Sequence, residues 1–514
     1  QDDWRLTQKL TLNLGLRYEL FTTVKERFNE QGTFDLTDPT TPTIIVPKGQ
    51  NMQLTPTLAS QIRLSPTGSS GLVPVDTNNF APRIGFAYQL TPNTVVRGGY
   101  GIFYGGQENG PYSNPSPGFN PPFFVTQSFN GPCGAASANP ALFAAGADCA
   151  VPGISNQPGG IPGSAGIAVG FPATSLTDPN TPTLFSIDPK LVTPYMQQWN
   201  FGIERQLGGN TMLQITYAGS KGTKLFTFYN GNQAAPSADP NAAFAPRRPV
   251  PAIDNSISLF ASDGGSKYNS LQTRLEKRFT HGFSLLASYT YSNSEDNASN
   301  ANLGSQNNDG FRWFMFPQWE WGHSSFDVRH RFTLSYIYQL PIGHGRRFLS
   351  GISGAAEQVL GGWQVAGITT VSSGNWFTPN DSNGSFANSD GFQYPNVVAD
   401  PNSSPHCLPG TFFNTCAFTD PPLGSFGNAA RNSILGPGFQ TWDASIFKTF
   451  QINERTHLEF RSEFFNFPNH TNFLLSQSGP QQSNNSTVLG ASQFGFLTAA
   501  RAPRQIQFAL KLMF

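Results

Sequence analysis

The sequence predicts an all-β protein, and more narrowly a transmembrane antiparallel β-barrel. Three observations predict this fold class. Segments of about ten residues alternate between apolar and polar side chains, as in a strand with one apolar and one polar face. Short turns join these segments at one end, and long stretches rich in Gly, Pro, Ser and Asn join them at the other. Charged residues make up only 12% of the chain, about half their share in an ordinary soluble domain.

The segment 10–20 shows the alternation most clearly, because LTLNLGLRYEL places its leucines and Tyr18 on one face and Arg17 and Glu19 on the other. A shorter strand is expected before it, at 3–7. The alternation recurs, in chain order, over 80–89, 94–104, 199–204, 213–217, 269–279, 283–291, 331–338, 363–373, 440–450, 458–464 and 505–514. These segments make about thirteen strands, of the length that a tilted strand needs to cross a bilayer.

The connections alternate in length along the chain. Short turns are expected at 7–9, 91–93, 208–210, 280–282 and 451–455, and long polar loops at 25–79, 105–194, 220–267, 295–326, 375–438 and 468–503. The connection 341–362 is intermediate, and SGAAEQVL within it favours a short helix. In bacterial outer-membrane barrels the short turns face the periplasm and the long loops face the outside. Aromatic residues near both strand ends, such as Trp199 and Trp363, are typical of the two aromatic girdles of such barrels.

The composition argues against other classes of protein. The chain has 31 Lys+Arg and 31 Asp+Glu, with no basic blocks, and nucleic-acid binding relies on positive charge. No apolar run approaches the roughly 18 residues of a membrane helix. A soluble β-sandwich or propeller also shows alternation, but loops of several tens of residues are unusual in compact soluble domains. The first residues, QDDWRLT, have neither the basic nor the apolar region of a signal peptide, so none is expected in residues 1–514, either because it has been removed or because the chain is a fragment.

The four cysteines form two local pairs in the sequence, Cys133 with Cys149 and Cys407 with Cys416. Disulfides are the expected state of both pairs, which indicates an oxidising compartment such as the periplasm or the cell surface. A metal site is the alternative for the second pair, because His406 stands beside Cys407. Neither pair has the C-x-x-C spacing that favours a metal.

Several segments resemble TonB-dependent outer-membrane receptors, and most closely the Oar-like group with a carboxypeptidase-regulatory-like N-terminal domain that is abundant in Acidobacteria. The resemblance covers essentially the whole chain and is strongest in the strands. The segments that carry it are QDDWRLTQKLTLNLGLRYEL, NNFAPRIGFAYQL, TVVRGGYGIFYGG, QQWNFGIERQL, YNSLQTRLEKRFTHGFSLLASYTYS, DVRHRFTLSYIYQLP and the terminal IQFALKLMF.

The resemblance implies a plugged barrel of about 22 strands in the bacterial outer membrane. Residues 1–514 are then expected to be its C-terminal part, with the N-terminal plug, the TonB-contacting box and about nine strands absent. It implies uptake of a large solute, such as a siderophore, an oligosaccharide or a peptide or protein, with energy from the TonB complex. Phe514 matches the terminal aromatic residue that the barrel assembly machinery reads; otherwise it is one more lipid-facing residue.

Signals of catalysis are weak, so neither an enzymatic activity nor a cofactor is expected. The sequence has no G-x-S-x-G elbow, H-E-x-x-H motif or P-loop. Charged residues on the polar faces of the strands are the candidates for contact with the lumen: Arg17, Glu19, Arg83, Arg97, Glu204, Arg274, Glu276, Arg331, Asp443, Glu459, Arg461 and Glu463. They form either an ion-paired wall that holds a plug or a path that the solute follows.

The loops carry two further candidates. The segment FRWFMFPQWEW is rich in aromatic residues, and Trp313, Phe316, Trp319 and Trp321 are candidates for capture of a sugar or peptide. Packing of this loop onto itself or onto the barrel rim is the alternative. The Asn- and Asp-rich segments at 292–309 and 380–390 offer oxygen ligands for Ca²⁺, although flexible surface loops are the simpler interpretation.

Two other functions remain open from the sequence. One is an adhesion or structural protein of the outer membrane whose loops bind partners without transport. The other is a soluble secreted β-protein.

Overall fold

The computed structural model describes residues 2–105, 117–123, 184–299, 311–475 and 486–514, apart from residues 24, 55, 68–70, 74, 209, 382–386, 388, 405 and 454. Strands are the main secondary structure of the described residues, and the helices are short. None of the described helices is long and apolar enough to cross a membrane.

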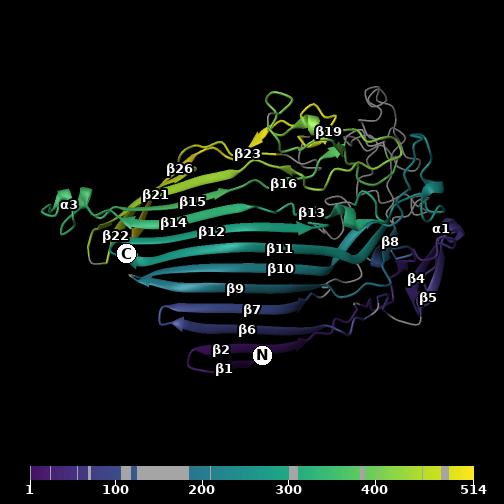
Figure 1. The fold of residues 1–514 in the computed structure, drawn as a ribbon, viewed down its shortest axis with the longest axis horizontal. Helices are drawn as coiled ribbons and strands as arrows, with labels where there is room; N and C mark the ends of the chain where they lie inside the picture. The colour runs from purple at the N-terminus through teal and green to yellow at the C-terminus, as the bar shows by residue number, and fades with distance from the viewer. Residues whose placement is uncertain are drawn as a thin grey trace, which may run out of the picture.

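One large antiparallel sheet dominates the structure, and it runs through thirteen strands in the order of the chain. They are β1 (Asp2–Arg5), β2 (Leu10–Tyr18), β6 (Phe80–Thr91), β7 (Thr94–Tyr104), β9 (Tyr195–Gly208), β10 (Thr211–Asn230), β11 (Ile257–Thr280), β12 (Phe283–Asp296), β14 (His330–Gln339), β15 (Gln364–Ser372), β21 (Phe439–Gln451), β22 (His457–Phe465) and β26 (Gln505–Met513). The short turns lie together at one end of the sheet and the long connections at the other (Figure 1). In the described residues this sheet has β1 at one edge and β26 at the other. These two strands are not paired with each other, so the described sheet is not a closed barrel.

The register of the strands separates the side chains into two faces. Leu14, Ile84, Tyr100 and Trp199 lie opposite one another in a single row across four strands. Many large apolar side chains of this face are exposed, and Leu16 exposes 68% of its surface. An apolar face of this extent needs an apolar environment, as the lipid-facing side of an outer-membrane barrel has.

Two strands are much longer than the sequence predicts. β10 has 20 residues and β11 has 24, whereas 220–267 was expected to be a loop. The pairing of the two strands continues as far as Asn230 and Ser258, with irregularities on either side of Leu225. Lys224 has a positive φ of 58° there, so a bulge lets the hairpin bend without ending the ladder. A break in the apolar alternation therefore marks the end of the membrane-facing part and not the end of the strand.

The long connections fold into a layer beyond the strand ends, which we call the loop layer (Figure 1). It contains α1 (Pro56–Gln61) and a three-stranded sheet of β3 (Thr33–Phe34), β4 (Thr43–Pro47) and β5 (Arg63–Thr67), while β8 (Leu184–Ile187) pairs with β11. A buried cluster that includes Phe34, Ile44, Ile62, Leu184 and Ile257 joins these elements. The described parts of the long loops therefore have a core of their own.

The C-terminal half of the loop layer is held by pairs of two-residue strands. They are β16 (Trp376–Phe377) with β20 (Ile434–Leu435), β17 (Asn380–Asp381) with β24 (Val488–Leu489), β18 (Asn396–Val397) with β19 (Phe418–Thr419), and β23 (Phe473–Leu474) with β25 (Ala499–Ala500). The short β13 (Gly322–His323) extends the main sheet beside β12. A second buried cluster around Phe413, Phe418 and Ile434 packs beneath them.

The short helix expected in the connection 341–362 is confirmed as α3 (Ala355–Leu360). It lies at the end of the short turns and extends past the strand ends (Figure 1). Gly354 precedes it and Gly361 follows it, and Gly354 has a positive φ of 61°. Glycine adopts this backbone conformation without the steric cost that a Cβ would add.

Aromatic rings cover glycines on the apolar face at three places. Each glycine lies opposite or beside its aromatic partner on a neighbouring strand, and the pairs are Gly98 with Phe86, Gly219 with Trp199, and Gly367 with Tyr336. A Cβ on any of these glycines would lie within 2.7 Å of an atom of the ring. The absence of a side chain lets the ring lie flat across the ladder, so the glycines shape the apolar face.

Substitution of Gly367 by valine should destabilise the sheet by roughly 1–3 kcal/mol, because the Tyr336 ring must move out of its contact. Urea titration of the full-length protein in lipid vesicles measures the free energy of unfolding. Gly351→Ala is the matched control, because a Cβ on Gly351 meets no atom within 4 Å. Equal stabilities of the two variants would contradict this account of the glycine.

Candidate functional site

The charged residues that the sequence singles out lie on one face of the main sheet. Glu204 and Arg274 both lie opposite Gln214, on the strands to either side of it. Arg97 and Arg331 stand at the two ends of another such row, which crosses the sheet through small and polar residues. Glu19 directly follows β2, and the remaining candidates fall on the same face as these rows. We call this surface the polar face.

Most ion pairs on the polar face join residues two apart on one strand. Arg17 pairs with the neighbouring Glu19 at 2.8 Å, and Arg274 pairs with Glu276 at 2.9 Å. Arg461 contacts Glu459 at 2.8 Å and Glu463 at 3.5 Å. Arg97 and Glu204, at 3.5 Å, instead connect the adjacent strands β7 and β9. The arginines of these pairs are well exposed, so each pair contributes about 1 kcal/mol or less to stability.

Three predicted residues have other surroundings. The guanidinium of Arg83 lies 4.4 Å from the centre of the Phe103 ring, in a cation–π contact. Arg331 is exposed on β14. Asp443 accepts hydrogen bonds from the Thr441 hydroxyl at 3.1 Å and from the backbone N–H of Asn466 at 2.8 Å. This carboxylate therefore fixes the chain where β22 ends.

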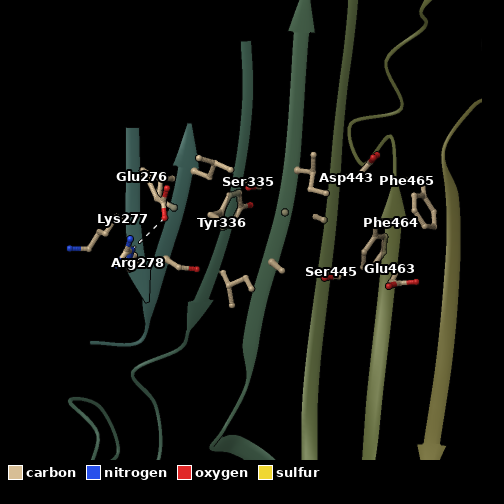
Figure 2. Close-up of a pocket in the computed structure, with 18 of the residues that line it drawn as sticks. Glu276, Lys277, Arg278, Ser335, Tyr336, Asp443, Ser445, Glu463, Phe464 and Phe465 are labelled. Carbon is tan, nitrogen blue, oxygen red and sulfur yellow. Dashed lines mark ion pairs between the residues drawn. The ribbon is translucent and has the colours of Figure 1, made fainter. Parts of the chain in front are cut away.

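A hollow of about 550 Å³ lies over the polar face between β11 and β22. Glu276 and Arg278 stand on one side of it and Asp443 and Glu463 on the other, with Ser335 between them (Figure 2). Its floor contains an apolar stripe of Leu286, Ile337 and Ile368. The hollow thus has charged rims around an apolar centre, which suits the binding of an amphipathic surface.

The apolar stripe is not among the sequence predictions above, although the sequence contains a signal for it. Leu285 and Leu286 are consecutive on β12, and Ile337 lies between two tyrosines on β14. Two successive apolar residues in a strand place one on each face. These interruptions of the alternation mark where the polar face becomes apolar.

The loop layer brings three of the four predicted loop aromatics together. Phe316 and Trp319 stack with ring centres 4.7 Å apart, and Trp313 lies 5.3 Å from Phe316. Phe426, from a distant part of the chain, stacks on Trp313 at 5.6 Å. These four residues form the aromatic cluster. Trp321 stands apart from it, with its ring close to Gly265.

Buried charges support the aromatic cluster from below. Arg312 Nε donates to Glu320 Oε1 at 2.8 Å, and its other nitrogens donate to the carbonyl oxygens of Gly427 at 2.8 Å and Trp319 at 3.0 Å. Both members of this pair are buried. The arginine therefore ties both aromatic segments, 313–319 and 426, to one ion pair.

A second buried arginine joins the same region to the end of β12. Arg431 pairs with Asp296, donates to the backbone carbonyl of Glu320 at 3.0 Å and to the Ser299 hydroxyl at 2.8 Å. The described parts of 292–309 and 380–390 do not lie wholly at the surface, because Asp296, Asp381 and Ser389 are buried. Buried polar groups need hydrogen-bond partners, and the arginines supply them.

Tyr394 is buried beside the ion pair of Arg312 and Glu320. Burial raises the pKa of its phenol well above 10, and the negative charge of Glu320 acts in the same direction. A raised pKa means that the folded loop layer holds the proton more tightly than the unfolded chain. The contribution of this shift to the stability of the loop layer is therefore fully present below pH about 10 and is lost as the pH rises beyond it.

The structure pairs Cys407 with Cys416 in a disulfide. Cys133 and Cys149 lie outside the described residues. Among the described residues no group of three or more His, Cys, Asp or Glu side chains could hold a metal ion. The Asp296 carboxylate, one of the oxygen donors considered for Ca²⁺, is instead paired with Arg431.

Comparison with known proteins gives one family match. The family model described as "Outer membrane beta barrel domain" matches residues 1–507. No curated protein matches the chain.

Solved structures with a similar arrangement include the outer-membrane transporter YddB of Escherichia coli, with 11% identity and a TM-score of 0.43 over 85% of this chain and 42% of that one. The ferric-catecholate import receptor Fiu of E. coli K12 has 12% identity and a TM-score of 0.38 over 99% and 43%. The siderophore receptor PiuA of Acinetobacter baumannii has 11% identity and a TM-score of 0.38 over 99% and 42%. The chain thus spans less than half the length of these proteins.

Substitution Glu320→Gln should loosen the loop layer by about 3–5 kcal/mol, because it leaves the buried charge of Arg312 without its partner. Limited proteolysis of the full-length protein in detergent measures this loosening as faster cleavage in the loop layer. The control is Glu459→Gln, which removes an exposed ion pair and should cost about 1 kcal/mol or less. The account fails if both variants are cleaved at the same rate as the unsubstituted protein.

Proposed function

Because the chain belongs to the outer membrane beta barrel domain family and lies in the bacterial outer membrane, we propose that it forms the wall of a receptor for uptake of a large solute. The protein acts by binding and passage, without covalent chemistry. The solute belongs to one of three classes, which are siderophores, oligosaccharides and peptides or proteins.

The observation that carries this proposal is the hollow on the polar face. A sheet that serves only to hold loops at the cell surface needs an apolar side toward lipid but no recessed amphipathic surface on the other side. Here the charged rim of Glu276, Arg278, Asp443 and Glu463 surrounds an apolar centre. Such a surface can hold a plug at rest and contact the solute when the plug moves.

The loop layer supports the capture step. Trp319 is 43% exposed and the neighbouring Met315 is 57% exposed, although the layer beneath them is tightly packed. A rigid support lowers the entropy lost when a ligand binds. Aromatic faces held in this way can stack on a sugar ring or on the planar groups of a peptide or siderophore.

The finer assignment is a TonB-dependent receptor of the Oar-like type, which the segments quoted above support by resemblance. In this assignment a plug gates the lumen and the TonB complex supplies the energy. The exposed Phe514 at the end of β26 serves as the signal for the barrel assembly machinery. The polar face then belongs to a barrel of about 22 strands, in which the plug contacts the hollow.

Uptake by the native host distinguishes transport from adhesion. Cells that lack the gene and cells that carry it are given labelled ferric siderophores, oligosaccharides and peptides, with and without a protonophore. We expect the gene to support uptake of one class, and the protonophore to abolish it while surface binding remains. Surface binding without uptake of any class would favour the adhesion protein instead.

Substitution Trp319→Ala should reduce binding of the transported solute roughly five- to thirty-fold, because one stacking contact with a ring is worth about 1–2 kcal/mol when desolvated. Binding to whole cells at 4 °C measures the change in Kd. Phe28→Ala is the matched control, since Phe28 is an exposed aromatic of the loops outside the aromatic cluster. A similar loss in both variants would remove the aromatic cluster from the capture step.

A further inference from the structure

The connection 341–362 differs from every other described turn at its end of the sheet. The other turns there, residues 6–9, 92–93, 209–210, 281–282 and 452–456, have two to five residues. The connection 341–362 instead forms a folded hairpin with α3 that extends past the strand ends (Figure 1). We call it the turn-end hairpin. Since a two-residue turn is enough to join antiparallel strands, the additional residues need another explanation.

The turn-end hairpin is fixed internally by its acidic residue. The Glu357 carboxylate accepts a hydrogen bond from the backbone N–H of His344 at 2.6 Å. Gly343 and Gly361 lie against the same carboxylate, where a Cβ would meet its oxygen atoms within 3 Å. Phe348 and Pro341 are joined by a backbone hydrogen bond of 2.9 Å. These bonds close the hairpin next to the end of β14.

The hairpin also attaches to the apolar face of the barrel wall. Lys448 lies on that face, opposite Phe460, and is only 3% exposed. Its ammonium group donates to the carbonyl oxygens of Gly361 and Glu357 at the end of α3, and lies 5.6 Å from the Trp363 ring. The Trp363 indole N–H donates to the Val359 carbonyl at 2.9 Å. The hairpin thus covers a charge that would otherwise face lipid.

The outer surface of the hairpin combines apolar and basic residues. Phe348, Leu349, Val359 and Leu360 are 54%, 51%, 62% and 47% exposed. Arg346 and Arg347 are exposed beside them, and the guanidinium of Arg347 lies 5.5 Å from the Phe348 ring. Because Glu357 is engaged inside the hairpin, the exposed charge of this surface is positive.

We propose that the turn-end hairpin is a membrane-surface anchor that binds the anionic phospholipids of the periplasmic leaflet. Phe348, Leu349, Val359 and Leu360 enter the boundary between headgroups and acyl chains, and Arg346 and Arg347 bind the lipid phosphates. The apolar and basic pattern is the one that interfacial segments use.

Lipid is favoured over a periplasmic protein because the surface is continuous with the lipid-facing side of the sheet. Val359 and Leu360 lie within five residues of the first residue of β15, and Val359 is bonded to Trp363 at the aromatic girdle. A surface in this position meets the headgroup region as soon as the strands span the bilayer. The two exposed arginines match the negative phosphates found there.

Hydrogen–deuterium exchange of the full-length protein in nanodiscs tests the proposal. We expect the backbone of 341–362 to exchange on the order of ten times more slowly in phosphatidylethanolamine with phosphatidylglycerol than in phosphatidylethanolamine alone. The double variant Arg346→Glu and Arg347→Glu should abolish this difference. Free inorganic phosphate should not reproduce the protection, since it offers no apolar boundary.

The matched control is the double variant Arg27→Glu and Arg63→Glu, which makes the same change of charge at exposed positions of the loop layer. It should leave the exchange of 341–362 unchanged. Equal exchange of the unsubstituted protein in the two lipid mixtures would overturn the proposal. Because the assay needs no transported solute, its outcome is independent of the uptake experiment.

A photo-crosslinking residue in place of Phe348 identifies the partner directly. Cells that express the full-length protein with p-benzoylphenylalanine at this position are irradiated, and the adducts are identified by mass spectrometry. A phospholipid adduct is expected. An adduct with a periplasmic protein in its place, or no lipid adduct, would overturn the assignment of this surface to the membrane.

Discussion

The pairing of backbone N–H and C=O groups in lipid is the constraint on which the rest of this structure depends. No water is present in the bilayer core, so each strand must take its partners from its neighbours. The thirteen strands meet this demand by following chain order without a crossover, and β1 and β26 need strand partners at their outer edges for the same reason. Since strand pairing uses the backbone N–H and C=O groups, only the side chains distinguish the two faces of the sheet. The apolar face, the polar face and the hollow all follow from which residues alternate.

Charge is placed according to the solvent that each part of the chain meets. Exposed ion pairs occupy the polar face, where water screens them and each contributes little. The fully buried pairs, Arg312 with Glu320 and Arg431 with Asp296, lie in the loop layer. There they add to the buried apolar clusters, and the bonds from Arg312 to Gly427 and from Arg431 to Asp296 join segments more than a hundred residues apart. Lys448 is a charge on the apolar face; a carbonyl oxygen of the turn-end hairpin binds its ammonium group, and the rings of Trp363 and Phe450 lie beside it.

The strands were predictable from the sequence because period-two alternation depends on local residues alone. α3 was also predictable, since AAEQVL has strong helix formers between glycines. The continuation of β10 and β11 was not, because their outer ends face the loop layer and lose the alternation. Phe426 could not be assigned to the aromatic cluster, since it contacts Trp313 from more than a hundred residues away. The buried arginine pairs could not be predicted for the same reason, because nothing local in the sequence identifies the partner of each arginine.

The ion pairs of the polar face have a mechanical consequence. Arg274 pairs with Glu276, and Arg461 pairs with Glu459 and Glu463, within their own strands. Sliding or splaying one strand against the next therefore breaks few electrostatic contacts. Among the ion pairs named on the polar face, Arg97 with Glu204 is the one that joins two strands. Resistance to a change of curvature therefore comes mainly from the backbone ladder and little from the ion pairs.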